Sequence, residues 1–325
     1  MAEISAQLVK QLRDRTGAGM MECKKALQKT NGDLEKAVDE LRKSGIAGAS
    51  KKESRSTKQG IISASINAQG KSGVLVEVNC ESDFVARTED FQSLAADVAS
   101  HIAEMKPKTV RVEDVTEAER VRFHTHEALY EQKFTKDEGT TVGELVKTKI
   151  AKLGENINVS RFASFDAAGN GVVGHYIHTG AQIGVLLEVN SGAAGTSAKD
   201  EFKTLVRDVA MQVAAAHPQF VSRDQLPAAL LAKEREIQRE RALGEGKPEK
   251  MVDKIAEGRL GKFYEEVCLL DQPFIRENTI SVAELIKTVG VKIGDTINVV
   301  RFVRYKVGDS GDAPGVQESP LPVTA

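Results

Sequence analysis

Tryptophan is absent from this 325-residue chain, and aromatic residues make up only 5% of it. So few aromatic side chains cannot supply the stacking platforms of a single-strand nucleic-acid binder. The charge is nearly balanced, with 45 lysines and arginines against 47 aspartates and glutamates. A domain that tracks phosphate backbones is usually strongly basic. We therefore expect no direct binding of nucleic acid.

Cysteines and long apolar runs are also scarce. The three cysteines, Cys23, Cys80 and Cys268, lie far apart and form neither a disulfide framework nor a zinc pattern, which favours a reducing compartment. No stretch approaches the roughly 20 apolar residues that span a bilayer. The first residues lack the basic region and apolar run of a secretory signal. These features predict a cytoplasmic protein without membrane contacts.

Local catalytic motifs are missing as well. Gly17-Ala18-Gly19 is not followed by the lysine of a phosphate-binding loop at the required spacing. His124 and His126 are two positions apart, so on a helix they would point away from each other and form a poor metal pair. We expect no metal, no cofactor and no enzymatic activity, although an enzyme with dispersed catalytic residues stays open.

The N-terminal part has helical periodicity. Apolar residues predict three short helices within residues 1–45, the first capped by Ser5 and the last ended by Ser44-Gly45. Residues 46–59 are small, polar and basic, which is typical of a linker, with a frayed helix as the alternative.

The remainder is an internal duplication. Residues 60–103 align with 171–214 with 14 of 44 positions identical, and 142–162 align with 282–302 with 12 of 21 identical. Each repeat reads as two antiparallel strands, helices and a later third strand. This pattern predicts an α+β core with a first half at 60–165 and a second half at 170–302.

Each half carries an insertion. Between residues 233 and 262, 16 of 30 residues are charged and a narrow apolar seam remains. This segment predicts an antiparallel helical hairpin, a coiled coil, over about 223–265, with a solvated spacer as the alternative. Residues 113–140 predict a comparable helical insertion in the first half. The glycine-, proline- and serine-containing residues 303–325 predict a disordered tail.

One segment breaks the repeat. After the matched strand, the first half continues with Glu81-Ser82-Asp83-Phe84, where the second half has small residues. If both halves share one fold, the scaffold does not need Asp83 and Phe84, and loops held by rigid scaffolds often carry function. The alternative is that Phe84 packs into its own core and Asp83 caps the next helix.

Several motifs resemble the bacterial elongation factor Ts family. Residues 12–27 are similar to the opening signature of that family, and 76–87 are similar to its second signature; 152–158 and 176–178 also match. The resemblance implies a guanine-nucleotide exchange factor whose partner is elongation factor Tu. It also implies an N-terminal ubiquitin-associated-like helical domain, a two-part core and a helical hairpin.

The resemblance also assigns roles to residues. In this family an Asp-Phe pair enters the partner near its magnesium ion, so region 82–85 is expected to act there, with Asp83 and Phe84 flanked by Ser82 and Val85. The other partner contacts that the resemblance implies are Leu153, Gly154, His178, Arg13, Met20 and Met21. A scaffold or adaptor with a similar helical domain but no exchange activity stays open; the asymmetry at Asp83 and Phe84 speaks against it.

Overall fold

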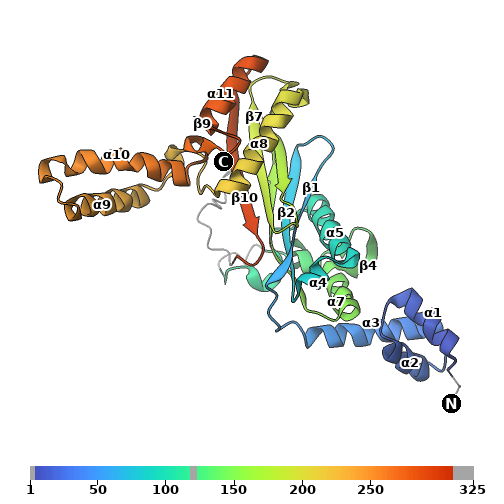
Figure 1. The fold of residues 1–325 in the computed structure, drawn as a ribbon. Helices are drawn as coiled ribbons and strands as arrows, with labels where there is room; N and C mark the ends of the chain where they lie inside the picture. The colour runs from blue at the N-terminus through green and yellow to red at the C-terminus, as the bar shows by residue number, and fades with distance from the viewer. Residues whose placement is uncertain (1–3, 118–122, 310–325) are drawn as a thin grey trace.

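The structure is a computed structural model that describes residues 4–117 and 123–309, and it is elongated (Figure 1). A three-helix module and a helical hairpin lie at opposite ends, and a core with two three-stranded sheets joins them. None of the helices in the two described ranges combines the length with the hydrophobicity that a bilayer span requires.

Three helices form the N-terminal module, as predicted. They are α1 (Ala6–Thr16), α2 (Met20–Lys29) and α3 (Leu34–Ser50). Ser5 caps α1, because its side chain accepts a backbone N–H at 3.2 Å. Leu12, Cys23 and Leu27 are fully buried between the helices. The module therefore has a small apolar core of its own.

The third helix is longer than predicted. We expected it to stop at Ser44-Gly45 and a linker to begin at residue 46, but α3 continues to Ser50. A Cβ on Gly45 would lie 3.0 Å from the Cβ of Ala151 in α7 (Val142–Leu153). Glycine thus lets α3 pack closely on α7, and this packing outweighs the low helix propensity of glycine. The irregular connection is limited to residues 51–58.

Two antiparallel sheets form the core and confirm the α+β prediction. The first has the order β1-β2-β5, and the second has the equivalent order β6-β7-β10. Their strands are β1 (Gln59–Ile66), β2 (Ser72–Cys80), β5 (Ile157–Asp166), β6 (Val172–Ile177), β7 (Ile183–Ser191) and β10 (Ile297–Lys306). The duplication read from the sequence is therefore a duplication of structure.

Helices cover the outer face of each sheet, and the inner faces pack together (Figure 1). The first sheet carries α5 (Glu89–Met105) and α7, and the second carries α8 (Asp200–Ala216) and α11 (Val282–Ile293). The cluster between the sheets comprises Ile62, Leu75, Phe165, Val173, Leu186, Val303 and Tyr305. The central strand β2 is consequently buried on both faces, which explains its nearly continuous apolar sequence.

Two buried ion pairs repeat this symmetry. Nε of Arg161 lies 2.8 Å from Glu77, and the guanidinium group lies 4.3 Å from the ring centre of Tyr305. The matched Arg301 lies 2.8 Å from Glu188 and 4.3 Å from the ring centre of Phe165. Each arginine therefore joins a glutamate of its own half to an aromatic ring of the other half.

The predicted helical hairpin is present and projects from the core (Figure 1). It consists of α9 (Ala228–Gly244) and α10 (Glu249–Val267). Its seam buries Gln238, Ala242, Val252, Ala256 and Leu260. Ion pairs such as Arg235–Glu257, at 3.1 Å, bridge the two helices outside the seam. The high charge of the segment is thus compatible with a narrow coiled-coil contact.

The predicted helical insertion at 113–140 is wrong for its described part, which excludes 118–122. This part contains η1 (Val112–Asp114), η2 (Thr125–Glu127), η3 (Leu129–Glu131) and a hairpin of β3 (Lys133–Phe134) and β4 (Asp137–Thr141). An equivalent hairpin, β8 (Pro273–Phe274) and β9 (Glu277–Ser281), precedes α11. Strands as short as β3 and β8 leave no readable alternation in the sequence.

A buried side-chain hydrogen bond anchors each small hairpin to a long helix that covers the sheet of the same half, α5 or α8. Nε2 of His101 lies 3.1 Å from Oε1 of Gln132, and Nε2 of Gln212 lies 3.1 Å from Oε1 of Gln272. Burial lowers the pKa of His101, so its ring is neutral near pH 7. The structural repeat therefore includes the two small hairpins, which lie outside both pairs of aligned sequence segments.

The predicted tail begins later than expected. We expected disorder from residue 303, but β10 runs to Lys306 because its last residues still pair with β7. Residues 310–325, the rest of the predicted tail, lie outside the described residues.

Candidate functional site

A one-turn helix, α4 (Asp83–Ala86), presents Asp83 and Phe84 directly after β2. Ser82 is its N-cap, because its Oγ accepts a backbone N–H three residues later at 3.4 Å. Thr88 caps α5 in the same way at 3.3 Å. Two capping residues six positions apart therefore confine this segment to a short turn between strand and helix.

Phe84 points away from the core. Its side chain is 81% exposed, whereas Val85 and Ala86 pack toward the core of the first half. Burying a phenylalanine stabilises a fold by about 1.5–3 kcal/mol, and this fold forgoes that gain. The alternative in which Phe84 packs inward and Asp83 caps the next helix is wrong, because Thr88 is the cap of α5.

Asp83 forms an ion pair on the surface. Its Oδ2 lies 2.9 Å from a guanidinium nitrogen of Arg87, and the two side chains are 49% and 79% exposed. Water screens such a pair strongly, and exposed pairs contribute little to stability. A charged group of a partner can therefore compete with Arg87 for the carboxylate of Asp83.

Leu153 and Gly154 lie beside this turn. They end α7, where Gly154 is exposed with a φ of +82° and Leu153 is half-buried against the first-half core. Ser82 donates its N–H and its hydroxyl to the carboxylate of Glu155 at 2.9 and 2.6 Å. The structure thus brings two predicted site segments together that are about 70 residues apart in the chain.

His178 lies at the same end of the core. It follows β6, is exposed, and its Nδ1 lies 3.0 Å from the hydroxyl of Tyr176. The turn that contains it packs on β1, because Ile62 donates its N–H to the carbonyl of Ala181 at 2.7 Å. In the same turn, the side chain of Gln182 donates to the carbonyl of Gly60 at 2.8 Å, next to the residue of β1 that pairs with the end of β2, so the turn lies near the end of the first sheet that leads into α4.

The N-terminal candidates are exposed on the helical module. Met20 and Met21 are 48% and 65% exposed at the start of α2, and Arg13 is exposed on α1. The connection between α1 and α2 lies next to the end of α7, since a Cβ on Gly17 would be 2.7 Å from Cε of Lys152. Exposed methionines are common on adaptable interaction surfaces. This edge of the module therefore adjoins the site on the core.

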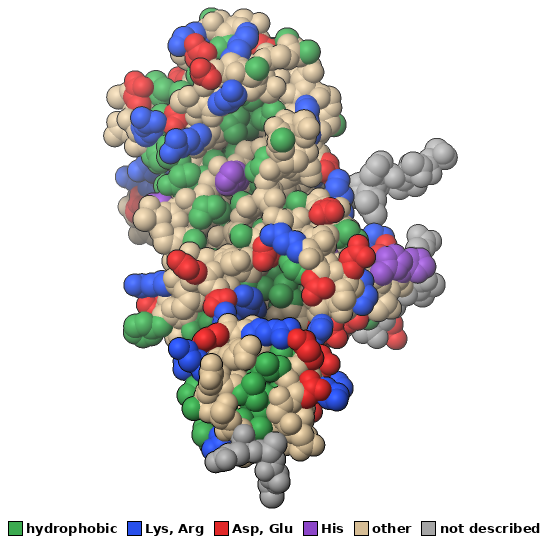
Figure 2. All heavy atoms as spheres, turned by 90° about the vertical axis from the view of Figure 1, so that its right-hand side faces the viewer, with side chains coloured by type: hydrophobic (Ala, Val, Ile, Leu, Met, Phe, Trp, Pro, Cys, Tyr) green, Lys and Arg blue, Asp and Glu red, His purple; other side chains and the backbone are tan. Residues whose placement is uncertain are grey.

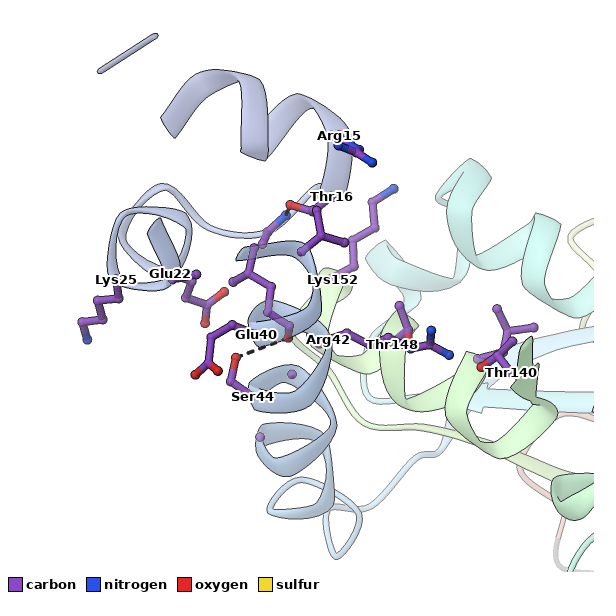
Figure 3. Close-up of a pocket in the computed structure, with 18 of the residues that line it drawn as sticks. Arg15, Thr16, Glu22, Lys25, Glu40, Arg42, Ser44, Thr140, Thr148 and Lys152 are labelled. Atoms are coloured by element: carbon purple, nitrogen blue, oxygen red, sulfur yellow. Dashed lines mark hydrogen bonds between the residues drawn. The ribbon is translucent and has the colours of Figure 1, made fainter. Parts of the chain in front are cut away.

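A cavity of about 660 Å³ lies between the module and α7, beside the contact of α3 with α7 (Figure 3). Apolar side chains such as Val38, Leu41 and Leu145 line it together with charged ones, among them Arg15, Glu22, Lys25, Glu40, Arg42 and Lys152. Neither Asp83 nor Phe84 lines it. The cavity thus lies at the junction of two parts of the chain, apart from the exposed Phe84.

The three cysteines are buried and free, and His124 and His126 lie side by side. His124 is the N-cap of η2, a 3-10 turn, and its ring stacks on that of His126 with centres 5.4 Å apart, so the expectation that the two side chains point away from each other is wrong. Within residues 4–117 and 123–309, no three histidine, cysteine or acidic side chains come together as a metal site. Figure 2 shows lysines and arginines interspersed with acidic side chains over the face in view. The charges on this face therefore form no patch of a single sign.

Sequence analysis did not single out Glu155. It stands inside a recognised motif, but its hydrogen-bond partner Ser82 lies 73 positions earlier. One signal was available: the repeat places another acid, Asp295, at the matched position of the second half.

The comparisons with known proteins agree with the predicted family. A family model described as Elongation factor TS matches residues 81–309. Elongation factor Ts of a Nostoc species is 45% identical over 311 residues, which cover 95% of this chain and 94% of that relative. Elongation factor Ts of Clostridium acetobutylicum is 42% identical over 306 residues, covering 94% of this chain and 93% of the relative. On these matches, the chain belongs to the elongation factor Ts family of translation elongation factors.

Proposed function

We propose that this chain binds elongation factor Tu and promotes release of its GDP, as a guanine-nucleotide exchange factor. The observation that carries the proposal is Phe84, exposed beside Asp83 on a capped turn for which the second half has small residues instead. Membership of the family supports the same conclusion. Exchange makes no covalent bond, so it needs no catalytic side chains.

The proposed mechanism is competition between two ligands of the same GTPase. A protein that binds the nucleotide-free form more tightly than the GDP-bound form weakens GDP binding by the same factor. Phe84 enters between helices of the partner as an apolar wedge. Asp83, whose pair with Arg87 is exposed, disturbs the polar groups around the partner's magnesium ion. GDP then leaves and GTP replaces it.

The other candidate residues extend the contact. Leu153 and Gly154 precede Glu155, which binds Ser82, and they would fit the same partner surface together with His178. Arg13, Met20 and Met21 would provide a second contact from the helical module. This activity belongs to translation, and we place it in the cytoplasm.

A release assay tests the proposal. Small amounts of the chain should accelerate the loss of fluorescent GDP from elongation factor Tu, and excess GDP should weaken the complex between the two proteins, because the coupling is reciprocal. Binding of equal strength with and without GDP, together with unchanged release, would identify an adaptor instead.

Two matched glycines should separate stability from exchange. Gly154 and Gly294 end α7 and α11 with φ values of +82° and +72°, and a Cβ on either meets no atom within 4 Å. Alanine in this left-handed region costs about 1–2 kcal/mol, so both alanine variants should lose similar stability in urea unfolding. We expect slower GDP release only for Gly154→Ala, whose methyl group stands in the proposed contact. Impaired exchange by a fully stable Gly294→Ala protein would contradict this assignment of the binding face.

A further inference from the structure

We propose that Glu155 is a positioning residue, which holds Asp83 and Phe84 in the geometry that exchange requires. Both of its carboxylate oxygens are used: Oε2 accepts the N–H of Ser82 at 2.9 Å, and Oε1 accepts its hydroxyl at 2.6 Å. Two charge-assisted hydrogen bonds from one residue fix both its distance and its direction. This role rests on the proposed function and deepens it.

The remaining polar groups of Ser82 are bound as well. Its carbonyl accepts the Sγ–H of Cys80 at 3.1 Å, and its Oγ accepts the N–H of Val85 at 3.4 Å. Burial, followed by the nearby charge of Glu155, raises the pKa of Cys80 to about 12, so the thiol stays protonated and can donate. A single helical turn such as α4 is not stable alone. Its position therefore depends on what holds Ser82 at its start, together with the packing of Val85 and Ala86.

A reciprocal contact strengthens this connection. Glu81, the residue before Ser82, accepts the N–H of Asn156, the residue after Glu155, at 2.7 Å. The two adjacent pairs thus bind each other in both directions. Asn156 is only 4% exposed, and its side chain donates to the carbonyl of Arg55 at 2.8 Å. The anchor of the turn is therefore part of the buried framework.

The second half contains an equivalent acidic side chain that binds its strand-to-helix connection, but no Asp-Phe pair. Asp295, at the position that matches Glu155, accepts the hydroxyl of Thr196 at 2.5 Å and the N–H of Ala193 at 3.1 Å. The hydrogen bond from Thr196 is the main reason why the pKa of Asp295 is lowered. In both halves, an acidic side chain at this position therefore holds the strand-to-helix connection through hydrogen bonds. Only the connection held by Glu155 carries an Asp-Phe pair. Asp295 is therefore a matched control for the loss of stability that removal of such an acid causes.

The test compares the full-length chain with Glu155→Ala and Asp295→Ala. Both variants should lose a similar amount of stability in urea unfolding. Glu155→Ala should slow GDP release from elongation factor Tu about fivefold, within the range by which such supporting residues change coupling. Asp295→Ala should leave release within about twofold of the unchanged chain.

The same substitution in a protein that already lacks the exchange residues distinguishes a positioning role of Glu155 from a general loss of structure. If Glu155 acts through Asp83 and Phe84, Glu155→Ala should have no further effect on release in a protein that carries both Asp83→Ala and Phe84→Ala. Equal slowing in both backgrounds, or equal slowing by Asp295→Ala, would overturn the inference. Should Glu155→Ala fail to fold, Glu155→Gln, which keeps the shape and one acceptor, should show the same pattern with a smaller effect. The proposed function fails separately, if the unchanged chain does not accelerate release at all.

Discussion

Replacing Phe84 with alanine should slow GDP release from elongation factor Tu by at least about tenfold, or about 1.4 kcal/mol of lost coupling. The wedge is then missing, while Asp83 and the capped turn remain. Because the side chain is 81% exposed, its removal should change the free energy of unfolding by no more than about 0.5 kcal/mol. Fluorescent-GDP release at saturating chain, together with urea unfolding, measures both quantities.

Val291 offers a matched control. It is an apolar side chain that is 77% exposed on α11, in the half without the Asp-Phe pair. Val291→Ala removes exposed apolar surface but leaves the wedge intact, so release should be unchanged. A properly folded Phe84→Ala protein with full exchange activity would show that the wedge hypothesis is wrong.

Replacing Arg161 with alanine should cost about 3–5 kcal/mol of the free energy of unfolding. The side chain of Glu77 is 2% exposed, and its pair with Arg161 at 2.8 Å neutralises a buried charge. Without Arg161, that carboxylate stays buried without its cation, and Tyr305 of the other half loses a stacked guanidinium group. Urea unfolding at pH 7 measures the loss.

Two further arginines calibrate this result. Arg301→Ala breaks the equivalent pair with Glu188, whose side chain is 6% exposed, and should cost a similar amount. Arg235→Ala breaks an exposed pair on the helical hairpin and should cost less than about 1 kcal/mol. If Arg161→Ala destabilises the chain no more than Arg235→Ala does, the pairs Arg161–Glu77 and Arg301–Glu188 do not hold the two sheets together.

Much of this architecture could be predicted from the amino-acid sequence. Helical spacing located the three N-terminal helices, and the repeat located both sheets, because residues that face a common core recur at the period of the helix or strand that carries them. Comparison of the two repeats also identified Asp83 and Phe84 as residues that the scaffold does not need. These features depend on near neighbours or on internal comparison, and both are present in one sequence.

Other features were decided by tertiary structure. The extension of α3 past Gly45 depends on close contact with Ala151, and the small hairpins depend on anchors such as the hydrogen bond between His101 and Gln132. The contact of Ser82 with Glu155 joins positions 73 apart. Such pairs leave no periodic trace, because nothing in the local pattern of either residue specifies the other. The sequence determined which residues form the core, and it singled out Asp83 and Phe84 as residues that the fold does not need. Only the tertiary structure decided which contacts hold these two residues in place, because those contacts come from distant parts of the chain.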